Sequence, residues 1–346
     1  MSHVKKVAIV GATGSQGKFI VDELLKLGKH EVTAITRVES NAVIPEGVKV
    51  AKVNYEDHSS LVAALRGQDV LIITMSVWAP KDAQKKLVDA AADAEVPWIL
   101  PNNWGLDTTN DALGDDTFLG PPSRAIQKHI DDLGKSSWIA MACGFWYEFS
   151  LGGSPDRFGF NFAERSVVFF DDGTAPIHTS TWPQVGRAVA KLLSLKTYPD
   201  DENDKSVTLS SYKSRCVRVS SFDVSQRDVF DSVLRVTGTR PEDWKITHES
   251  SAQRYREAAD RVPKGDFSAF ARAMYTRVFF PDGSGRLDWG GWTLDNETLG
   301  LPQEDLDEYT RIGIEMEKLP AYGSRTAVEG REHAILSSNA LSANKS

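Results

Sequence analysis

A glycine-rich turn near the N-terminus is of the kind that holds phosphate groups. It reads Gly-Ala-Thr-Gly-Ser-Gln-Gly over residues 11–17, follows four apolar residues and precedes an expected helix over 18–27. The first glycine permits a tight turn, the second lets the backbone approach a pyrophosphate, and the third lets the helix pack closely on the strand. The helix N-terminus directs its amides and positive dipole end at the phosphates. A dinucleotide site is therefore predicted, with contacts from Gly11, Thr13, Gly14, Ser15, Gln16 and Gly17.

The end of the second expected strand, residues 31–36, bears on the choice of cofactor. A site for NAD usually has an acidic residue there, which binds both ribose hydroxyls. This chain instead has Thr36-Arg37, and a guanidinium can form paired bonds to the 2′-phosphate of NADP. Glu39 lies nearby and weakens the argument, and an ordinary solvated arginine is the alternative. NADPH is the predicted cofactor, with Arg37 at its 2′-phosphate.

Strands and helices alternate from the N-terminus to about residue 150. Such alternation predicts right-handed parallel crossovers and an α/β fold, a Rossmann-type doubly wound sheet. Further strands are expected over 48–53, 69–76, 98–101 and 137–142, and helices over 59–66, 81–94 and 122–133. Ligands of such sheets bind at the carboxyl ends of the strands. Those ends add to the predicted cofactor site Asn54 near the adenine, Thr74, Met75 and Ser76, and Pro101, Asn102 and Asn103 near the nicotinamide.

The regular alternation stops after residue 151. Strands are expected over 167–170 and 207–210, and helices over 182–195, 222–237, 250–262 and 303–318. We therefore expect an NADP-binding domain over 1–150 and a smaller, interleaved substrate lobe over 151–323, with elements of about 181–210 returning to the sheet. Residues 324–346 are small, polar or charged and are expected to form a disordered tail.

Composition narrows the class of protein. The net charge is −8, without a block of basic residues, which disfavours nucleic acid as a direct partner. The two cysteines, Cys143 and Cys216, have neither metal-like nor disulfide-framework spacing, which fits a reducing compartment. Because no signal peptide and no apolar stretch of spanning length is recognised, we expect a cytoplasmic protein without membrane contact.

Several stretches carry a resemblance to known proteins. They are the glycine-rich turn, Thr36-Arg37, and residues 53–57 (Val-Asn-Tyr-Glu-Asp), 99–105 (Ile-Leu-Pro-Asn-Asn-Trp-Gly), 144–148 (Gly-Phe-Trp-Tyr-Glu) and 182–186 (Trp-Pro-Gln-Val-Gly). Over most of residues 4–210 the chain resembles the NmrA-like and isoflavone reductase-like families, atypical short-chain dehydrogenases that bind NADP(H). Through residues 144–148 it is most similar to fungal CipA-like oxidoreductases. The resemblance implies a Rossmann-type fold and NADP(H) binding.

The reductases of this family carry a catalytic lysine that this chain lacks. Counting back from Gly134, the lysine position falls on Ser123 and that of a following glutamate on Gln127. The Tyr-x-x-x-Lys pair of the ordinary dehydrogenases is also missing from the sequence. Because the substrate develops negative charge during hydride transfer, it needs a proton donor or a cation. The candidates for this role are Ser123, Lys128, Tyr147 and His178, and the Asn103 amide could hold a carbonyl.

Each candidate also has a structural interpretation. Lys128 could be a solvated lysine, Tyr147 a packed aromatic residue and His178 a buried histidine with its hydrogen bonds satisfied. Trp78, Trp104 and Trp146 follow expected strands, and aromatic walls favour flat phenolic substrates. We therefore expect an NADPH-dependent oxidoreductase acting on an aromatic or phenolic small molecule of secondary metabolism. An NmrA-type redox sensor, a redox-neutral enzyme that retains NADP, and a homodimer all stay open.

Overall fold

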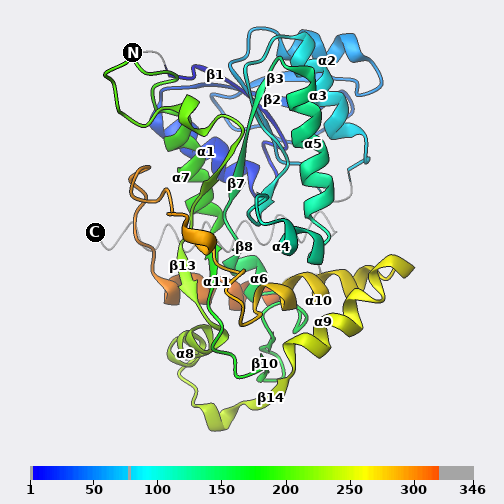
Figure 1. Ribbon diagram of the computed structural model, residues 1–346, viewed down its shortest axis with the longest axis vertical. Coiled ribbons are helices and arrows are strands. Elements are labelled where there is room, and N and C mark those ends of the chain that lie inside the picture. The colour runs from blue at the N-terminus through cyan, green and yellow to red at the C-terminus, as the bar shows by residue number, and fades with distance from the viewer. Residues whose placement is uncertain (1–2, 77–78, 319–346) are drawn as a thin grey trace.

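A parallel sheet forms the upper part of the molecule (Figure 1). The computed structural model describes residues 3–76 and 79–318. The sheet has the strand order β3-β2-β1-β4-β5-β7-β12, and a short strand β6 pairs with β7. Its strands are β1 (Lys6–Val10), β2 (Glu31–Arg37), β3 (Lys49–Val53), β4 (Val70–Ile73), β5 (Trp98–Leu100), β6 (Trp104–Gly105), β7 (Ser137–Ala142) and β12 (Arg215–Arg218). This order confirms the predicted doubly wound sheet, whose connections reverse direction beside β1.

Successive side chains of each strand point to opposite faces of the sheet, and both faces are buried. In β1, Val7 and Ile9 belong to one apolar core, whereas Ala8 and Val10 belong to another, as the two-residue period of a strand requires. The first core is covered by α1 (Gly17–Leu27) and α7 (Trp182–Leu193), which pack against each other. The second is covered by α2 (His58–Leu65), α3 (Ala83–Asp93) and α5 (Gly120–Leu133).

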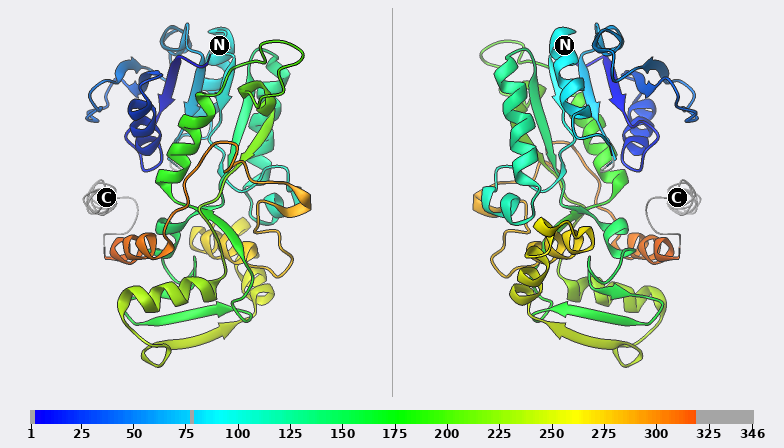
Figure 2. Two further views of the ribbon diagram at one scale, coloured as in Figure 1. Left: turned by 90° about the vertical axis from the view of Figure 1, so that its left-hand side faces the viewer. Right: turned by 90° about the vertical axis from the view of Figure 1, so that its right-hand side faces the viewer.

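A third, aromatic core lies below the sheet, and we call the elements around it the aromatic lobe (Figure 2). Two small sheets belong to it, in the orders β14-β10-β9 and β13-β11-β8. Their strands are β8 (Phe145–Trp146), β9 (Phe160–Asn161), β10 (Ser166–Phe170), β11 (Ile177–Ser180), β13 (Phe222–Val224) and β14 (Lys245–Glu249). The helices in this part of the chain are α4 (Asp111–Asp116), α6 (Tyr147–Leu151), α8 (Gln226–Thr237), α9 (Ser251–Ala259), α10 (Phe267–Val278) and α11 (Leu306–Glu317).

The segment 279–305 connects α10 to α11 by way of the central sheet. Leu287 is buried in the core shared with α3 and α5, and Leu299 is buried in the core shared with α1 and α7. Between them, the Asp295 carboxylate accepts hydrogen bonds from the Arg218 backbone N–H and the Tyr212 hydroxyl, both at 2.8 Å. The segment therefore ties the aromatic lobe to the edge strand β12.

Two of the expected elements are wrong in kind. Residues 207–210 do not join the sheet; a 3-10 turn over Leu209–Tyr212 follows instead, and Arg215–Arg218 pairs with β7. The expected helix over 222–237 is divided, because Phe222–Val224 pairs with β11 and the Ser225 hydroxyl caps α8. The expected tail, residues 324–346, lies outside the described residues.

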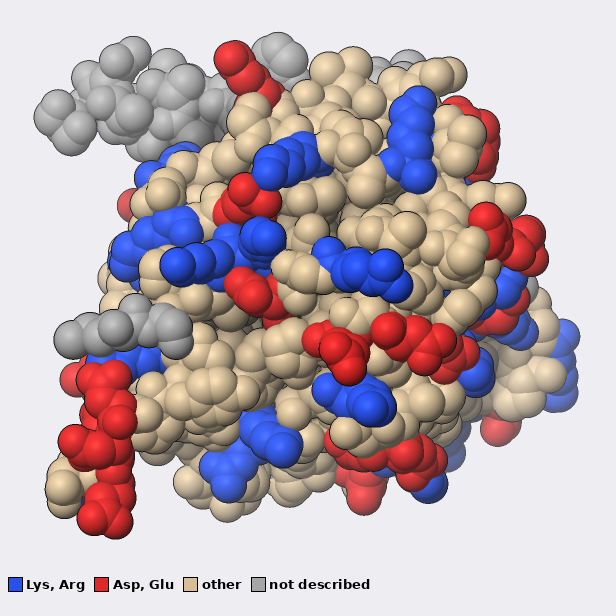
Figure 3. Space-filling view, turned by 90° about the horizontal axis from the view of Figure 1, so that it is seen from above, with Lys and Arg blue, Asp and Glu red and all other residues tan. Residues whose placement is uncertain are grey.

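The surface is charged but mixed in sign. On the face seen from above, basic and acidic side chains are interspersed (Figure 3). Within residues 3–76 and 79–318, no helix is both long enough and apolar enough to cross a membrane.

Candidate functional site

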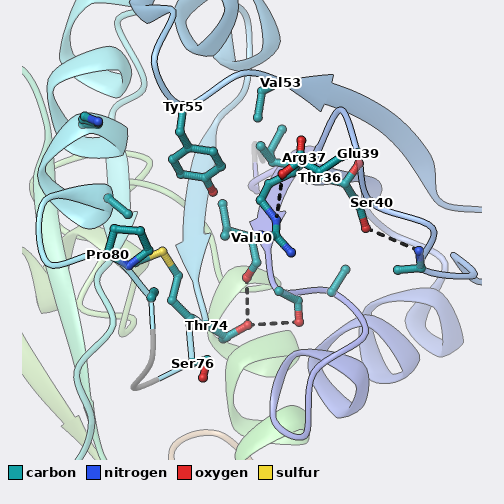
Figure 4. A pocket seen from close by; sticks show the side chains of 18 of the residues that line it. Val10, Thr36, Arg37, Glu39, Ser40, Val53, Tyr55, Thr74, Ser76 and Pro80 are labelled. Atoms are coloured by element: carbon teal, nitrogen blue, oxygen red, sulfur yellow. Dashed lines mark hydrogen bonds and ion pairs between the residues drawn. The ribbon is translucent and has the colours of Figure 1, made fainter. Parts of the chain in front are cut away.

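A cavity of about 610 Å³ opens at the carboxyl ends of β1, β2, β3 and β4 (Figure 4). This edge is where the doubly wound topology places ligands. The cavity is lined by the glycine-rich turn, the strand ends and the start of α3, including Gly11, Thr13, Arg37, Glu39, Asn54, Tyr55, Glu56, Thr74, Met75, Ser76, Asp82 and Lys86. The structure thus brings together predicted residues from four separate strand ends.

The glycines of the turn are required by close packing. Gly11 has φ +80°, and a Cβ there would lie 1.9 Å from the Thr74 carbonyl oxygen. A Cβ on Gly17 would lie 2.0 Å from the Gly11 carbonyl oxygen. The Thr74 hydroxyl donates to the Val10 carbonyl at 2.8 Å, so β4 holds the turn from beneath. The glycines thus let the turn pack closely on β4 at the N-terminus of α1, where helix amides and the helix dipole favour a phosphate group.

Gln16 gives a second sign that this turn accommodates a polar ligand. It stands at the N-cap of α1 and makes no side-chain cap hydrogen bond. Only 5% of the residue is exposed, and neither polar atom of its amide has a partner among the described residues. Because buried polar groups are normally hydrogen-bonded, the turn and Gln16 together fit a pyrophosphate and its neighbouring groups.

The adenosine side of the cavity carries the charges. The Arg37 guanidinium is well exposed, and its Nε lies 3.6 Å from Glu39 Oε1. Tyr55 stands on the opposite wall (Figure 4), and burial raises the pKa of its phenol. The Asn54 amide oxygen accepts the Glu56 N–H at 3.0 Å, so this predicted contact residue shapes the turn after β3.

Asn102 holds the loop after β4 in place. Its Oδ1 accepts the Met75 N–H at 3.0 Å, and its Nδ2 donates to the Met75 carbonyl at 3.2 Å. The Asn102 N–H in turn donates to Gln84 Oε1 at 2.6 Å. Pro101 lies buried at the end of β5, and its carbonyl accepts the Asn103 N–H at 2.7 Å. Asn102 thus acts as a clamp between two strand ends, and it also lines the next cavity along the edge.

That second cavity, of about 80 Å³, brings Asn103 and Ser123 together. Its walls are the stretch from Asn102 to Thr108 and the region where α4 meets the start of α5. The Asn103 Nδ2 atom is buried and has no partner among the described residues. An amide N–H donor and a serine hydroxyl therefore line the same small cavity.

The other three predicted catalytic residues line neither cavity. Lys128 is on the outer face of α5, where its ammonium pairs with Asp132 at 2.6 Å. Tyr147 is fully buried, its hydroxyl bonded to the Thr310 hydroxyl at 2.6 Å, and burial raises its pKa. His178 is also buried, its Nδ1 accepting the Leu287 N–H at 2.8 Å, and burial lowers its pKa. For these three side chains the structure favours the structural interpretations.

The sequence analysis missed the acidic and basic residues on the α3 side of the larger cavity. Lys86 lies 2.8 Å from Glu56 and 2.9 Å from Asp82, and these carboxylates raise its pKa. The spacing of Asp82 and Lys86 on one helix face could have indicated their pairing. The role of Glu56 depends on a contact between elements, which sequence spacing does not show.

The tryptophans expected at the site are divided between different places. Trp104 lines the smaller cavity, and its indole N–H donates to the Ile73 carbonyl at 2.8 Å. Trp146 packs against Trp182 of α7, with ring centroids 5.8 Å apart. Trp182 also stacks on Phe19 of α1, at 6.4 Å. Trp78 lies outside the described residues.

Comparison with known proteins agrees with this geometry. The model of the NmrA-like family matches residues 3–141. The oxidoreductase aprR of Aspergillus flavus is 27% identical over 311 residues, which cover 88% of this chain and 96% of the relative. The isoflavone reductase homolog IRL of Zea mays is 26% identical over 65% of this chain and 63% of its own length.

Solved structures share the fold. A structure of AtPrR2 with NADP⁺ and (+)pinoresinol has a TM-score of 0.70 at 19% identity, covering 90% of this chain and 100% of the other. The NADPH complex of the quinone oxidoreductase QOR2 from Escherichia coli has a TM-score of 0.63 at 19% identity, covering 88% and 98%. The chain is therefore an oxidoreductase that is similar to NmrA-like and isoflavone reductase-like proteins, with the match to the NmrA-like family model confined to residues 3–141.

Proposed function

We propose that this oxidoreductase uses NADPH to reduce an aromatic or phenolic small molecule of secondary metabolism. The observation that carries the proposal is the unpartnered, buried Asn103 Nδ2, which shares a small cavity with Ser123 directly beside the dinucleotide cavity. The fungal oxidoreductases among the relatives and the neighbour that contains pinoresinol support this substrate class.

The chain's own residues hold the cofactor as follows. The turn from Gly11 to Gly17 cradles the pyrophosphate, Arg37 faces the 2′-phosphate, and the loop clamped by Asn102 borders the nicotinamide half. When bound there, NADPH supplies the hydride. Asn102 lines the smaller cavity and binds the backbone of Met75, which lines the larger one, so in this proposal the substrate site adjoins the cofactor site.

Asn103 and Ser123 bind the substrate oxygen in this proposal. Two neutral donors aimed at an oxygen that gains negative charge stabilise the transition state more than the ground state. The Ser123 hydroxyl donates a hydrogen bond to that oxygen, in the place where the resemblance implies a lysine, and the oxygen takes its proton from solvent water. The Trp104 ring on the wall of the smaller cavity supports a flat substrate. In this proposal residues 151–323 supply the outer wall of the substrate site.

An NmrA-type redox sensor is the second candidate. No lysine, arginine or histidine is among the described residues that line the smaller cavity. A binding protein that only reports the oxidised-to-reduced ratio of the dinucleotide needs no charged donor there. The two candidates differ in one measurable respect, which is turnover.

The test begins with the purified full chain. Tryptophan fluorescence gives the Kd for NADPH, and NADPH oxidation is then followed with a panel of phenolic enones and aryl ketones. Asn103→Ala and Ser123→Ala should leave the Kd for NADPH within about twofold and lower kcat/KM by about 10². Asn203→Ala, at an exposed loop residue, is the matched control. Tight binding without turnover favours the sensor, and full activity in both variants refutes the assigned roles.

A further inference from the structure

The charges around the dinucleotide cavity do not all favour a phosphorylated cofactor. Lys86 is engaged by both Glu56 and Asp82. Arg37 is the other basic residue that lines the cavity, and it has the Glu39 carboxylate beside it. Any group that Arg37 binds must therefore share the guanidinium with Glu39, in a wall whose described residues include three acidic side chains and two basic ones.

Backbone hydrogen bonds at the end of β2 place Glu39 beside Arg37. Arg37 ends β2 in register with Val53, and the Val38 N–H donates to the Val53 carbonyl at 3.1 Å. The Ser40 N–H then donates to the Arg37 carbonyl at 2.9 Å. This turn returns the chain on itself and sets Glu39 next to Arg37, with both side chains directed at the same cavity (Figure 4).

The ion pair is loose, so a ligand can replace it. It joins the Nε edge of the guanidinium to Glu39 Oε1 at 3.6 Å, which is too long for a hydrogen bond. About 70% of each side chain is exposed (68% and 70%), and pairs of this kind contribute little to stability. The Glu39 carboxylate can therefore accept a hydrogen bond from a ligand in the cavity, next to the end of β2.

We propose that Glu39 sets the cofactor preference of this chain by opposing the 2′-phosphate of NADPH and accepting a hydrogen bond from the 2′-hydroxyl of NADH. A 2′-phosphate bound to Arg37 lies close to a like charge, which lowers its affinity. A 2′-hydroxyl has no charge and gains an acceptor. The chain then binds both dinucleotides, with a smaller preference for NADPH than Arg37 alone would give. This inference rests on the proposed dinucleotide function and adds the determinant of its selectivity.

The test compares Glu39→Gln with Glu46→Gln in the full chain. Glu46 is an exposed acidic residue of the same β2–β3 connection and does not line the cavity. Kd values for NADPH and NADH are measured by tryptophan fluorescence at 20 mM and 500 mM NaCl. Glu39→Gln should tighten NADPH binding about fivefold at low salt and about twofold or less at high salt, and should weaken NADH binding. Glu46→Gln should change both Kd values by less than about 1.5-fold.

Each outcome separates the two proposals. If wild type binds both dinucleotides and Glu39→Gln behaves as Glu46→Gln does, the role of Glu39 is refuted while the cofactor site stands. If wild type binds neither dinucleotide, the proposed function fails and this inference fails with it. Melting temperatures of the two variants should match that of wild type, because both carboxylates are exposed.

Discussion

Glu148 should make the stability of this protein fall as the pH rises. The residue belongs to α6 and is fully buried. Its Oε1 accepts the Trp182 N–H at 2.9 Å, whereas Oε2 has no partner among the described residues. Burial, helped by the nearby Glu304 carboxylate, raises the pKa of Glu148 to about 8. The folded protein therefore keeps this proton at neutral pH.

The size of the effect follows from proton linkage. An unfolded chain releases the Glu148 proton near its ordinary pKa of 4.5, whereas the folded chain holds it until about pH 8. Between these values the folded state binds more protons, so stability falls by up to about 1.4 kcal/mol per pH unit. The loss attributable to Glu148 is about 1 kcal/mol at pH 5 and about 4 kcal/mol at pH 8. Glu148→Gln removes this loss and preserves the acceptor for the Trp182 N–H.

Urea unfolding at pH 5, 6, 7 and 8 measures this difference directly. The free energy of unfolding of Glu148→Gln should rise relative to wild type by about 3 kcal/mol between pH 5 and pH 8. Any pH-independent cost of the amide cancels in this comparison. Glu164→Gln, at an exposed residue of the β9–β10 turn, should run parallel to wild type. A constant difference between Glu148→Gln and wild type across this range would refute the buried, protonated carboxyl.

Three further predictions follow from the geometry. His178→Ala should cost about 1 to 3 kcal/mol at pH 8, because it orphans the Leu287 N–H. This difference between wild type and the variant should shrink below about pH 6.5, where only the unfolded histidine gains a proton, and a difference in urea unfolding that stays constant with pH contradicts the assignment. Gly17→Ala should lower stability by about 3 kcal/mol or more and Gly28→Ala, which has open space, by about 1 kcal/mol, as melting curves would show. Asn102→Ala should weaken NADPH binding about tenfold in fluorescence titrations, and an unchanged Kd would show that its clamp is dispensable.

Local patterns were sufficient to predict the sheet from β1 to β5 and β7, but not its edge strand β12. The apolar runs that form β1 and β4, and the glycines that separate β1 from α1, act within a few residues of each other. The aromatic lobe was less predictable, because Phe222–Val224 continues into α8 without a break in apolar spacing. Only its pairing with β11 and the capping Ser225 distinguish strand from helix there, and the pairing is a tertiary contact.

The same distinction applies to the site. Gly11 and Arg37 were identifiable because the motif and the strand end fix their positions. Tyr147 and His178 looked equally suitable, but their partners, Thr310 and Leu287, lie 163 and 109 residues further along the chain. Ser123 reaches its cavity because α5 starts against α4. The contact between these two helices is a tertiary contact, and no pattern in the sequence around Ser123 indicates it.

The return of segment 279–305 to the central sheet has a consequence for biosynthesis. Leu287 and Leu299 complete the two cores of the sheet, and Asp295 binds the backbone of its edge strand. The bond from the Arg218 N–H to Asp295 links residues 77 positions apart, and such distant contacts slow folding. A nascent chain that has emerged only as far as α10 therefore has every strand of the dinucleotide-binding sheet but leaves both of its cores partly exposed. We therefore expect the N-terminal part to gain stability when this segment has been synthesised and packs on the sheet, and to expose apolar surface to chaperones until then.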